Sequence, residues 1–287
     1  MRFNSEQIKK IGKEISNKVE GKTLFDDFSR GRYSTDASVY QIKPLGVVLP
    51  KDTNDVLNII DYSQKNSIPL LARGGGSSQC GQTVGESLVL DYSKHQNKIL
   101  ELNVEEKYVW VQPGVVLDHL NSYLKPYGLW FPVDVSTSSR ATIGGMSANN
   151  SCGSRSLYYG NMVHNVLAIE AILDDGSLHT FNEINKNYLT TTNNQDRFYK
   201  IIDKFLHLRQ KVSKDIDNNW PTTQRRVGGY NIDLINPKGF NSSHLLVGSE
   251  GTLSLFNKIK LKLSEIPKNK VLGVCYFDNF HQAMELT

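Results

Sequence analysis

Three consecutive glycines follow an apolar run in the first third of the chain, in the segment Leu-Leu-Ala-Arg-Gly-Gly-Gly-Ser-Ser-Gln-Cys-Gly-Gln at residues 70–82. Glycine permits positive φ and lets the backbone approach a ligand closely. Successive backbone N–H groups in a tight turn form a concavity that favours anions, phosphate above all. We therefore expect this loop to hold the diphosphate of a nucleotide cofactor; the alternative is a glycine-rich surface turn.

The elements before the loop form a predicted strand–helix–strand unit. A strand over 47–49 is followed by a helix that Asp52 or Thr53 can cap, and a second strand covers 68–72. Such a unit implies parallel strands, and ligands bind at the C-terminal ends of the strands in open α/β sheets. The glycines do not form Gly-x-Gly-x-x-Gly and no helix opens directly after them, which disfavours an ordinary NAD fingerprint.

The later part of the chain changes character. Strands are predicted over 87–92, 108–111, 166–173, 177–181 and 255–263, and helices over 116–127 and 196–212. A long segment, 131–160, is rich in small and hydrogen-bonding residues and is expected to be a functional loop. The parallel opening and the antiparallel continuation predict an α+β fold with two lobes. One is a small parallel α/β lobe, and the other is a larger, mainly antiparallel lobe with flanking helices.

The composition and the spacing of charged, cysteine and histidine residues disfavour some classes of function. The chain has 287 residues, 39% hydrophobic and 22% charged, as expected for a globular protein with a sizeable core. The net charge of +4 is spread along the chain, so nucleic-acid binding gains no support. The three cysteines form no Cys-x-x-Cys pair and the seven histidines form no His-x-His or His-x-x-x-His pair, so no metal site is predicted.

The chain shows no signal peptide and no run long enough for a transmembrane helix, so we expect a cytoplasmic protein. Peripheral attachment to the inner face of a membrane, through another segment or subunit, stays open. We expect residues 1–30 to form an N-terminal helical arm and residues 31–266 the main domain. Residues 267–287 then read as the start of a truncated substrate (cap) domain, with a strand over 271–277 and a helix beginning near residue 279.

Three motifs stand in a fixed order, Arg-Gly-Gly-Gly-Ser-Ser from residue 73, Thr-Ile-Gly-Gly-Met-Ser-Ala-Asn-Asn from residue 142 and Gly-Ser-Glu-Gly-Thr-Leu from residue 248. Over residues 31–266 they resemble the FAD-binding (PCMH-type) domain of the vanillyl-alcohol oxidase and p-cresol methylhydroxylase superfamily. The branch that looks nearest is the FAD-linked oxidases, with D-lactate dehydrogenases, the glycolate oxidase flavin subunit and D-2-hydroxyglutarate dehydrogenase. The segments from Asn149 and from Arg225 look like members fused to an iron–sulfur half, which implies an iron–sulfur domain or subunit as electron acceptor.

The resemblance implies roles for individual residues. The first loop would receive the FAD diphosphate, and residues 132–153 would form a second wall for diphosphate, ribose and flavin. Val166 would lie on the adenine side and Glu250-Gly251 near the isoalloxazine. The implied cofactor-binding residues are Arg73, Gly74, Gly75, Gly76, Ser77, Ser78, Gln82, Pro132, Asp134, Thr142, Gly144, Gly145, Asn149, Gly153, Val166, Glu250 and Gly251.

Some members of the superfamily bond a histidine of the first loop to the flavin. Here Ser77 and Ser78 stand in that region and no histidine precedes His95, so we expect FAD to be held non-covalently. Cys152 is expected to be a small residue in a tight turn and not a cysteinyl link.

The resemblance implies oxidation of a small 2-hydroxy acid such as D-lactate, with a hydride passing to flavin N5. Arg225 and Arg226 are the candidates for gripping the substrate carboxylate, because a guanidinium binds a carboxylate through two hydrogen bonds. They could equally be solvated surface residues. His164 could face the flavin or be a structural histidine. Two other functions stay open. One is an FAD-binding module or truncated subunit whose catalysis is completed by missing segments or a partner. The other is an NADPH-dependent enolpyruvyl reductase of the same fold.

Overall fold

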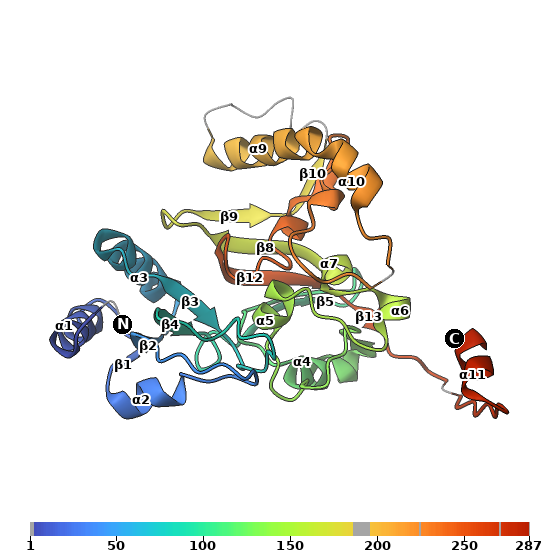
Figure 1. Cartoon of the computed structure of the whole chain (residues 1–287), viewed down its shortest axis with the longest axis horizontal. Helices are drawn as coiled ribbons and strands as arrows, with labels where there is room; N and C mark the ends of the chain where they lie inside the picture. The colour runs from blue at the N-terminus through green and yellow to red at the C-terminus, as the bar shows by residue number, and fades with distance from the viewer. Residues whose placement is uncertain (1–2, 186–195, 224, 270, 287) are drawn as a thin grey trace.

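Two lobes lie side by side in the computed structural model, which describes residues 3–185, 196–223, 225–269 and 271–286 (Figure 1). The small lobe holds a four-stranded sheet in the order β1-β2-β4-β3, with the strands β1 (Lys22–Leu24), β2 (Gly46–Leu49), β3 (Leu70–Arg73) and β4 (Leu88–Asp91). β4 pairs parallel with both β2 and β3, and β1 is antiparallel to β2. The predicted parallel unit is confirmed.

Three helices accompany the small sheet: α1 (Ser5–Ser16), α2 (Asp27–Arg32) and α3 (Thr53–Asn66). Asp52 caps α3 by accepting a hydrogen bond from the Asp55 backbone N–H, as its position before the helix predicts. α1 buries Ile8, Ile11 and Ile15 in the core of the small lobe. It therefore packs on this lobe, while the proposed domain division at residue 30 stays a prediction.

The large lobe is built on a five-stranded antiparallel sheet in the order β5-β6-β12-β8-β9. Its strands are β5 (Ile99–Asn103), β6 (Tyr108–Val111), β8 (Val166–Ile172), β9 (Leu178–Phe181) and β12 (Leu255–Lys262). β12 pairs with both β6 and β8 at the centre of the sheet. This arrangement confirms the α+β fold with a small parallel lobe and a larger antiparallel lobe. No strand was predicted at β5.

Shorter elements surround the large sheet. The helices are α4 (Leu117–Leu124), α5 (Ile143–Ala148), α6 (Ser156–Tyr159), α7 (Met162–Asn165), α9 (Arg197–Lys211) and α10 (Ser213–Asn219), with 3₁₀ turns η1 (Lys125–Tyr127), η2 (Ile232–Leu234) and η3 (Ser242–Leu245). The strands β7 (Leu129–Trp130) and β13 (Ser264–Glu265) pair with each other, as do β10 (Glu183–Asn185) and β11 (Gly239–Asn241). Because α5 and α6 interrupt residues 131–160, this segment is less irregular than predicted.

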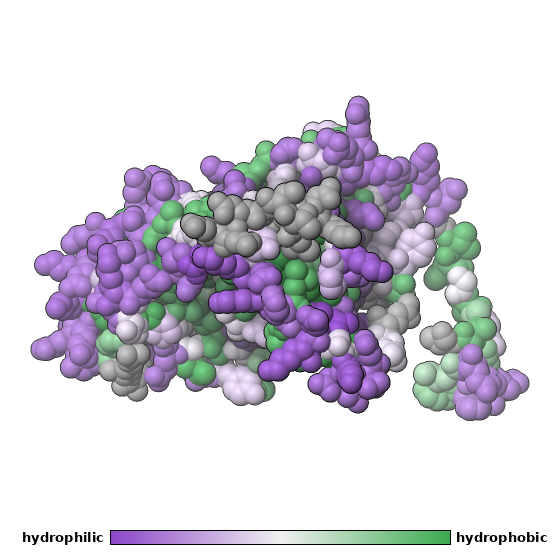
Figure 2. Space-filling model, turned by 90° about the horizontal axis from the view of Figure 1, so that it is seen from above, coloured by the Kyte–Doolittle hydropathy of each residue, from purple (hydrophilic) through white to green (hydrophobic). Residues whose placement is uncertain are grey.

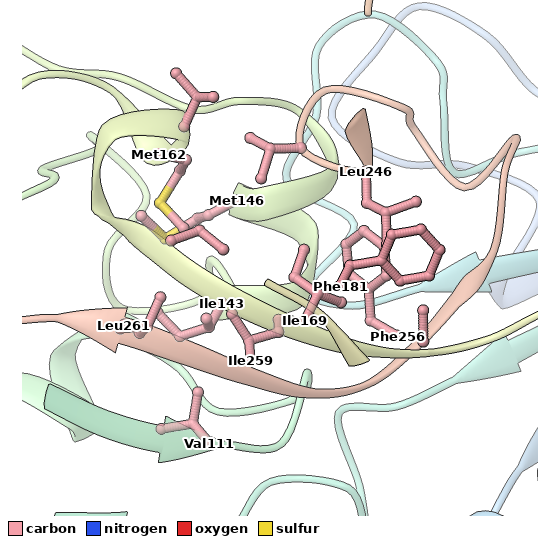
Figure 3. Packing of buried hydrophobic residues seen from close by; sticks show 14 of the residues in the cluster. Val111, Ile143, Met146, Met162, Ile169, Phe181, Leu246, Phe256, Ile259 and Leu261 are labelled. Atoms are coloured by element: carbon pink, nitrogen blue, oxygen red, sulfur yellow. The ribbon is translucent and has the colours of Figure 1, made fainter. Parts of the chain in front are cut away.

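The helix α5 is held by the core of the large lobe. Its Ile143 and Met146 are almost fully buried and lie over Ile259 and Leu261 of β12 (Figure 3). At the other end of the sheet, Ile172 and Leu255 pack into the core of the small lobe. The apolar contacts thus fix α5 within its lobe and fix the two lobes against each other.

The C-terminal segment leaves the body of the molecule. The strand predicted over 271–277 is wrong, because these residues pair with no other strand in the described part of the chain. A strand needs a hydrogen-bonded neighbour, and none adjoins Val271, Leu272 or Tyr276, each about nine-tenths exposed. The helix predicted after it is present as α11 (Phe280–Leu286). Figure 2 shows both hydrophobic and hydrophilic surface on this separate segment. Among the described residues, no helix combines the length and apolar character needed to cross a membrane.

Candidate functional site

The first wall of the candidate site is the loop 74–78, directly after β3. A Cβ atom added to Gly74 would lie 2.0 Å from Thr142 Oγ1, and one on Gly75 would lie 2.3 Å from the Arg140 carbonyl oxygen. Both separations are well inside van der Waals contact, so even alanine cannot fit without displacing a neighbour. The glycines therefore let loops of the two lobes approach each other, in addition to any approach to a ligand.

The same loop presents unused hydrogen-bond donors. Within the described part of the chain, the backbone N–H groups of residues 75–78 have no hydrogen-bond acceptor. Gly76 has φ +61, a left-handed conformation that glycine adopts without strain. Unpaired N–H groups gathered in a turn form an anion-binding concavity. The predicted diphosphate loop therefore has the donors that a diphosphate requires.

Arg73 supports this loop from behind. Its guanidinium donates to the backbone carbonyls of Tyr33 (3.3 Å), Thr35 (2.7 Å) and Thr83 (3.0 Å), and it lies 5.2 Å from the centre of the Tyr33 ring. Burial lowers the pKa of the guanidinium from its ordinary value, against the opposing attraction of Asp91. Arg73 thus ties three chain segments together, and the backbone is left as the main source of contacts to an anion.

The second wall is the start of α5. Thr142 caps this helix by accepting a hydrogen bond from the Gly145 backbone N–H at 3.3 Å. A Cβ on Gly144 would lie 2.6 Å from Pro113 Cβ, so this glycine lets α5 pack directly on the turn after β6. The motif therefore places the first turn of α5 opposite the loop 74–78.

The third wall is the tight turn at residues 248–252. The backbone N–H groups of Gly248 and Glu250 donate to the carbonyls of Ser147 and Ala148, which fixes the turn to the end of α5. Glu250 has φ +50, a conformation that costs energy for a residue with a side chain. Its carboxylate accepts a hydrogen bond from Gln82 Nε2 at 3.1 Å. The Gln82–Glu250 contact therefore joins the two lobes.

These walls enclose two adjoining cavities at the boundary of the lobes. The outer cavity is lined by the loop 74–78 together with Val135, Thr137 and Ser151. The inner cavity is lined by the ends of β3, β4, β6 and α5 and by the start of β12. Gly74, Thr142, Gly145 and Asn149 line both. Of the predicted cofactor-binding residues, those that line the cavities are Arg73, Gly74, Gly75, Gly76, Ser77, Ser78, Gln82, Thr142, Gly144, Gly145, Asn149, Glu250 and Gly251.

Four predicted residues lie outside this lining. Pro132 and Val166 are buried, Val166 in the core of the large lobe at the start of β8. Asp134 accepts hydrogen bonds from Ser154 Oγ (2.9 Å) and the Arg155 backbone N–H (3.1 Å). A Cβ on Gly153 would lie 2.2 Å from the Asp134 carbonyl oxygen. Asp134 and Gly153 thus shape the turn before α6, and direct contact of these four residues with a cofactor stays a prediction.

The candidate substrate-binding arginines also lie outside the two cavities. Arg226 pairs with Asp233 at 2.6 Å and lies over the Trp220 ring, 5.0 Å from its centre. Arg225 is exposed, and its Nε donates to Cys152 Sγ at 2.8 Å. The two neighbours therefore differ: Arg226 is held by a carboxylate and an aromatic ring, whereas Arg225 faces solvent beside a thiol.

His164 lies near these arginines and outside the cavities. Its Nδ1 accepts a hydrogen bond from the Asn161 backbone N–H at 3.0 Å, so the ring proton of the neutral form is on Nε2. Burial, and then the charge of Arg226, lowers the pKa of His164. Burial, and then His164, lowers the pKa of His244 to about 4. Both imidazoles are therefore neutral at pH 7, and His164 presents an N–H donor.

Several residues that line the inner cavity were missed by the sequence analysis, among them Tyr92, Pro113, Ser254 and Phe256. Tyr92 directly follows β4, whose C-terminal end lies beside that of β3. Since ligands bind at the C-terminal ends of parallel strands, the position of Tyr92 was a usable signal. Phe256 belongs to an antiparallel strand, and no local pattern marks it.

Comparison with protein families identifies the central part of the chain. Residues 44–182 match a family described as an FAD binding domain. The match includes the loop 74–78 and α5, which carry the unpaired N–H groups and the close glycine contacts. It confirms the resemblance stated from the three motifs and the predicted cofactor, FAD.

Known relatives extend the likeness beyond the matched segment. The chain is 34% identical over 274 residues to D-2-hydroxyglutarate dehydrogenase of Escherichia coli, covering 92% of this chain and 27% of the relative. It is 30% identical over 283 residues to glycolate oxidase subunit GlcD of Bacillus subtilis, covering 97% of this chain and 50% of the relative. The chain thus spans about a quarter of the first protein's length and half of the second's.

A solved structure of alkyldihydroxyacetonephosphate synthase has a similar fold, with a TM-score of 0.64 and 18% identity over 91% of this chain and 41% of that one. The low identity restricts this likeness to the fold. The sequence comparisons therefore show that residues 44–182 match the FAD binding domain family and that the chain is similar to D-2-hydroxyglutarate dehydrogenase and to glycolate oxidase subunit GlcD.

Proposed function

We propose that the chain is the FAD-binding part of an oxidoreductase that oxidises a small 2-hydroxy acid, D-lactate and D-2-hydroxyglutarate being the first substrates to test. The observation that carries the proposal is the cleft whose unpaired N–H groups, close glycine contacts and α5 all lie within the FAD binding domain match. The names of the relatives supply the substrate class. When bound, FAD supplies a flavin ring that accepts a hydride equivalent from the carbon that bears the hydroxyl.

The chain's own residues have separate tasks in this proposal. The backbone N–H groups of 75–78 bind the diphosphate, and the glycine contacts hold the lobes close enough to exclude water from it. FAD is held non-covalently, since Ser77 and Ser78 occupy the region from which a histidine would link. Pro132, Asp134, Gly153 and Val166 support the cofactor indirectly in this proposal, through the packing of the segments that carry the walls of the cleft.

Arg225 is the better candidate for binding the substrate carboxylate. Its terminal N–H groups have no acceptor among the described residues, whereas Arg226 is engaged by Asp233 and Trp220. His164 offers its Nε2–H to the substrate as a hydrogen-bond donor. In this tautomer it does not accept the hydroxyl proton, so the general base lies elsewhere.

A second candidate function is favoured by the length of the relatives. Because the chain spans 27% of D-2-hydroxyglutarate dehydrogenase, it could bind FAD while further segments or a partner complete catalysis. The substrate (cap) domain that we expect to begin near residue 267 would be one such segment. The fused iron–sulfur half has no support from the relatives named above and stays a prediction.

The test is anaerobic reduction of the FAD-loaded chain. Bleaching of the flavin band by D-lactate or D-2-hydroxyglutarate supports the dehydrogenase. Flavin that binds but is bleached by no hydroxy acid supports the module whose catalysis is completed elsewhere. Bleaching by NADPH supports the enolpyruvyl reductase. A chain that takes up no FAD would overturn the proposal.

A further inference from the structure

The turn at residues 248–252, the third wall of the cofactor cleft, has a backbone shape that needs support from its neighbours. Gly248, Glu250 and Gly251 have φ values of +84, +50 and +78, all in the left-handed region. Glycine adopts this conformation freely, but Glu250 carries a Cβ atom and is strained there. Such strain persists only where the surrounding structure fixes the chain. The hydrogen bonds to the end of α5 supply part of that support.

Further support comes from a second loop, at residues 229–231. Asn231 is only 2% exposed, and its Nδ2 donates to the backbone carbonyls of Val247 (2.7 Å) and His244 (3.2 Å). These carbonyls belong to the stretch that leads directly into the turn. Because the bonds are shielded from water, one side chain fixes the approach of the chain to the turn at two points.

The other two residues of this loop contact the turn itself. The carbonyl oxygen of Gly229 lies 2.9 Å from the position that a Cβ on Gly248 would take, so the two loops are in direct contact. Tyr230 OH lies 2.7 Å from Thr252 Oγ1. Thr252 Oγ1 uses its single hydrogen to donate to the Ser249 carbonyl at 2.6 Å, so Tyr230 is the donor of the bond between the hydroxyls.

The loop that carries these three residues is anchored on the large lobe at both sides. Before them, Arg226 pairs with Asp233 at 2.6 Å, and its backbone carbonyl accepts a hydrogen bond from Asn161 Nδ2 at 3.2 Å. After them, Ile235 is 3% exposed and packs in the core of that lobe. The loop is therefore fixed by contacts of its own and can hold the turn in place.

We propose that Tyr230 and Asn231 are positioning residues of the cofactor site, which hold the turn at 248–252 in its FAD-binding shape before FAD binds. A ligand that meets a preformed site does not lose affinity to the ordering of that site. Where the binding shape is only partly populated, the apparent affinity falls by the same fraction. The inference rests on the proposed function, and it extends the cofactor site to the loop that also carries Arg225.

The test uses Tyr230→Phe and Asn231→Ala in the full chain, with two measurements. The first is amide hydrogen exchange across residues 248–252 without cofactor, which reports local opening of the turn. The second is titration with FAD. In Tyr230→Phe both the exchange rate and the FAD dissociation constant should rise about two- to fivefold, the worth of one exposed hydrogen bond. In Asn231→Ala both should rise about tenfold or more, because two buried bonds are lost.

Tyr108→Phe is the matched control. It removes a phenolic hydroxyl that donates to exposed Glu101 at 2.7 Å, on a residue that lines neither cavity, and it should change neither measurement. Thr252 supplies a second control. Thr252→Ser keeps the hydroxyl and should bind FAD within about twofold of wild type. In a Thr252→Val background, Tyr230→Phe should add nothing, because the acceptor of its hydrogen bond is already gone.

FAD affinity equal to that of the wild type in both Tyr230→Phe and Asn231→Ala would overturn the proposal, because the two residues would then support the fold alone. Unchanged exchange across 248–252 in both variants would also overturn it. If Asn231→Ala does not fold, Tyr230→Phe and the Thr252 variants give the same comparison. A wild-type chain that binds no FAD would instead refute the proposed function, and the exchange rates of the cofactor-free chain would distinguish the two failures.

Discussion

The cofactor cleft and the region around Arg225 lie in the same lobed molecule but are built very differently. In the cleft, loops of both lobes meet with no room for one added carbon atom at Gly74 or Gly75. Arg225 itself is exposed, and a Cβ on Gly228 would meet nothing within 4 Å. Close packing therefore shapes the proposed cofactor cleft, whereas the proposed substrate contact at Arg225 would depend on a side chain that few neighbours hold in place.

Gly75→Ala should have the largest effect, because its Cβ collides with a backbone carbonyl that cannot rotate away. We expect a loss of about 1 to 3 kcal/mol in the free energy of unfolding and a fall in FAD affinity of about a hundredfold or more. Urea denaturation and FAD titration measure the two effects. Gly228→Ala is the matched control and should change neither. If Gly75→Ala binds FAD as tightly as the wild type, close packing at Gly75 is not required for cofactor binding and the contrast between the two regions is wrong.

The pH dependence of the free energy of unfolding reports on His244, which lies close to His164 on the Arg225 side of the molecule. His244 has a folded pKa of about 4, below its unfolded value near 6.5, so the unfolded chain binds a proton that the folded chain does not. The free energy of unfolding should therefore fall by about 2 to 3 kcal/mol from this group as the pH drops from 6.5 to 4. Urea denaturation at several pH values should show a smaller decline in His244→Gln. Parallel curves for wild type and variant would mean that His244 is not buried as described.

Loss of the Gln82–Glu250 contact between the lobes should have a smaller effect on FAD binding. Gln82→Ala removes the hydrogen bond donated to Glu250 and the one accepted from Ser78 Oγ, and should raise the FAD dissociation rate about two- to fivefold. Stopped-flow release of FAD measures the rate. Gln41→Ala, at an exposed glutamine bonded to Ser34, is the control. A dissociation rate equal to that of the wild type would show that the contact does not retain the cofactor.

Arg225→Ala should have the smallest effect on FAD binding. FAD affinity should stay within about twofold of wild type, whereas the hydroxy acid concentration for half-maximal flavin reduction should rise about tenfold, the worth of one charged hydrogen bond. Arg226→Ala should instead lower stability, because it leaves the Asp233 carboxylate without its ion pair. Loss of FAD binding in Arg225→Ala would contradict this expectation, because it would show that Arg225 contributes to the cofactor site.

The local signals in the sequence were strong where the backbone itself decides the structure. The parallel unit ending at Arg73 and the three glycine motifs followed from apolar runs and glycine spacing. Contacts between distant segments were not readable. Nothing local shows that Arg73 binds the carbonyls of Tyr33, Thr35 and Thr83, or that Tyr92 and Ser254 meet in one cavity.

The wrong strand at residues 271–277 has a related cause. Its apolar, β-branched residues have the composition of a strand, but composition does not supply a pairing partner. In the described part of the chain no strand adjoins it, and Val271 and Tyr276 remain exposed. Strand prediction from local pattern therefore failed where the deciding interaction is non-local.

The central claim is that the cleft between the lobes binds FAD without a covalent bond, and titration of the purified full chain with FAD tests it most directly. We expect saturable binding of one FAD per chain with a dissociation constant of about 1 μM or below, and complete release of the flavin into the supernatant on acid precipitation. Absence of saturable FAD binding, or flavin that stays with the precipitated chain, would contradict it.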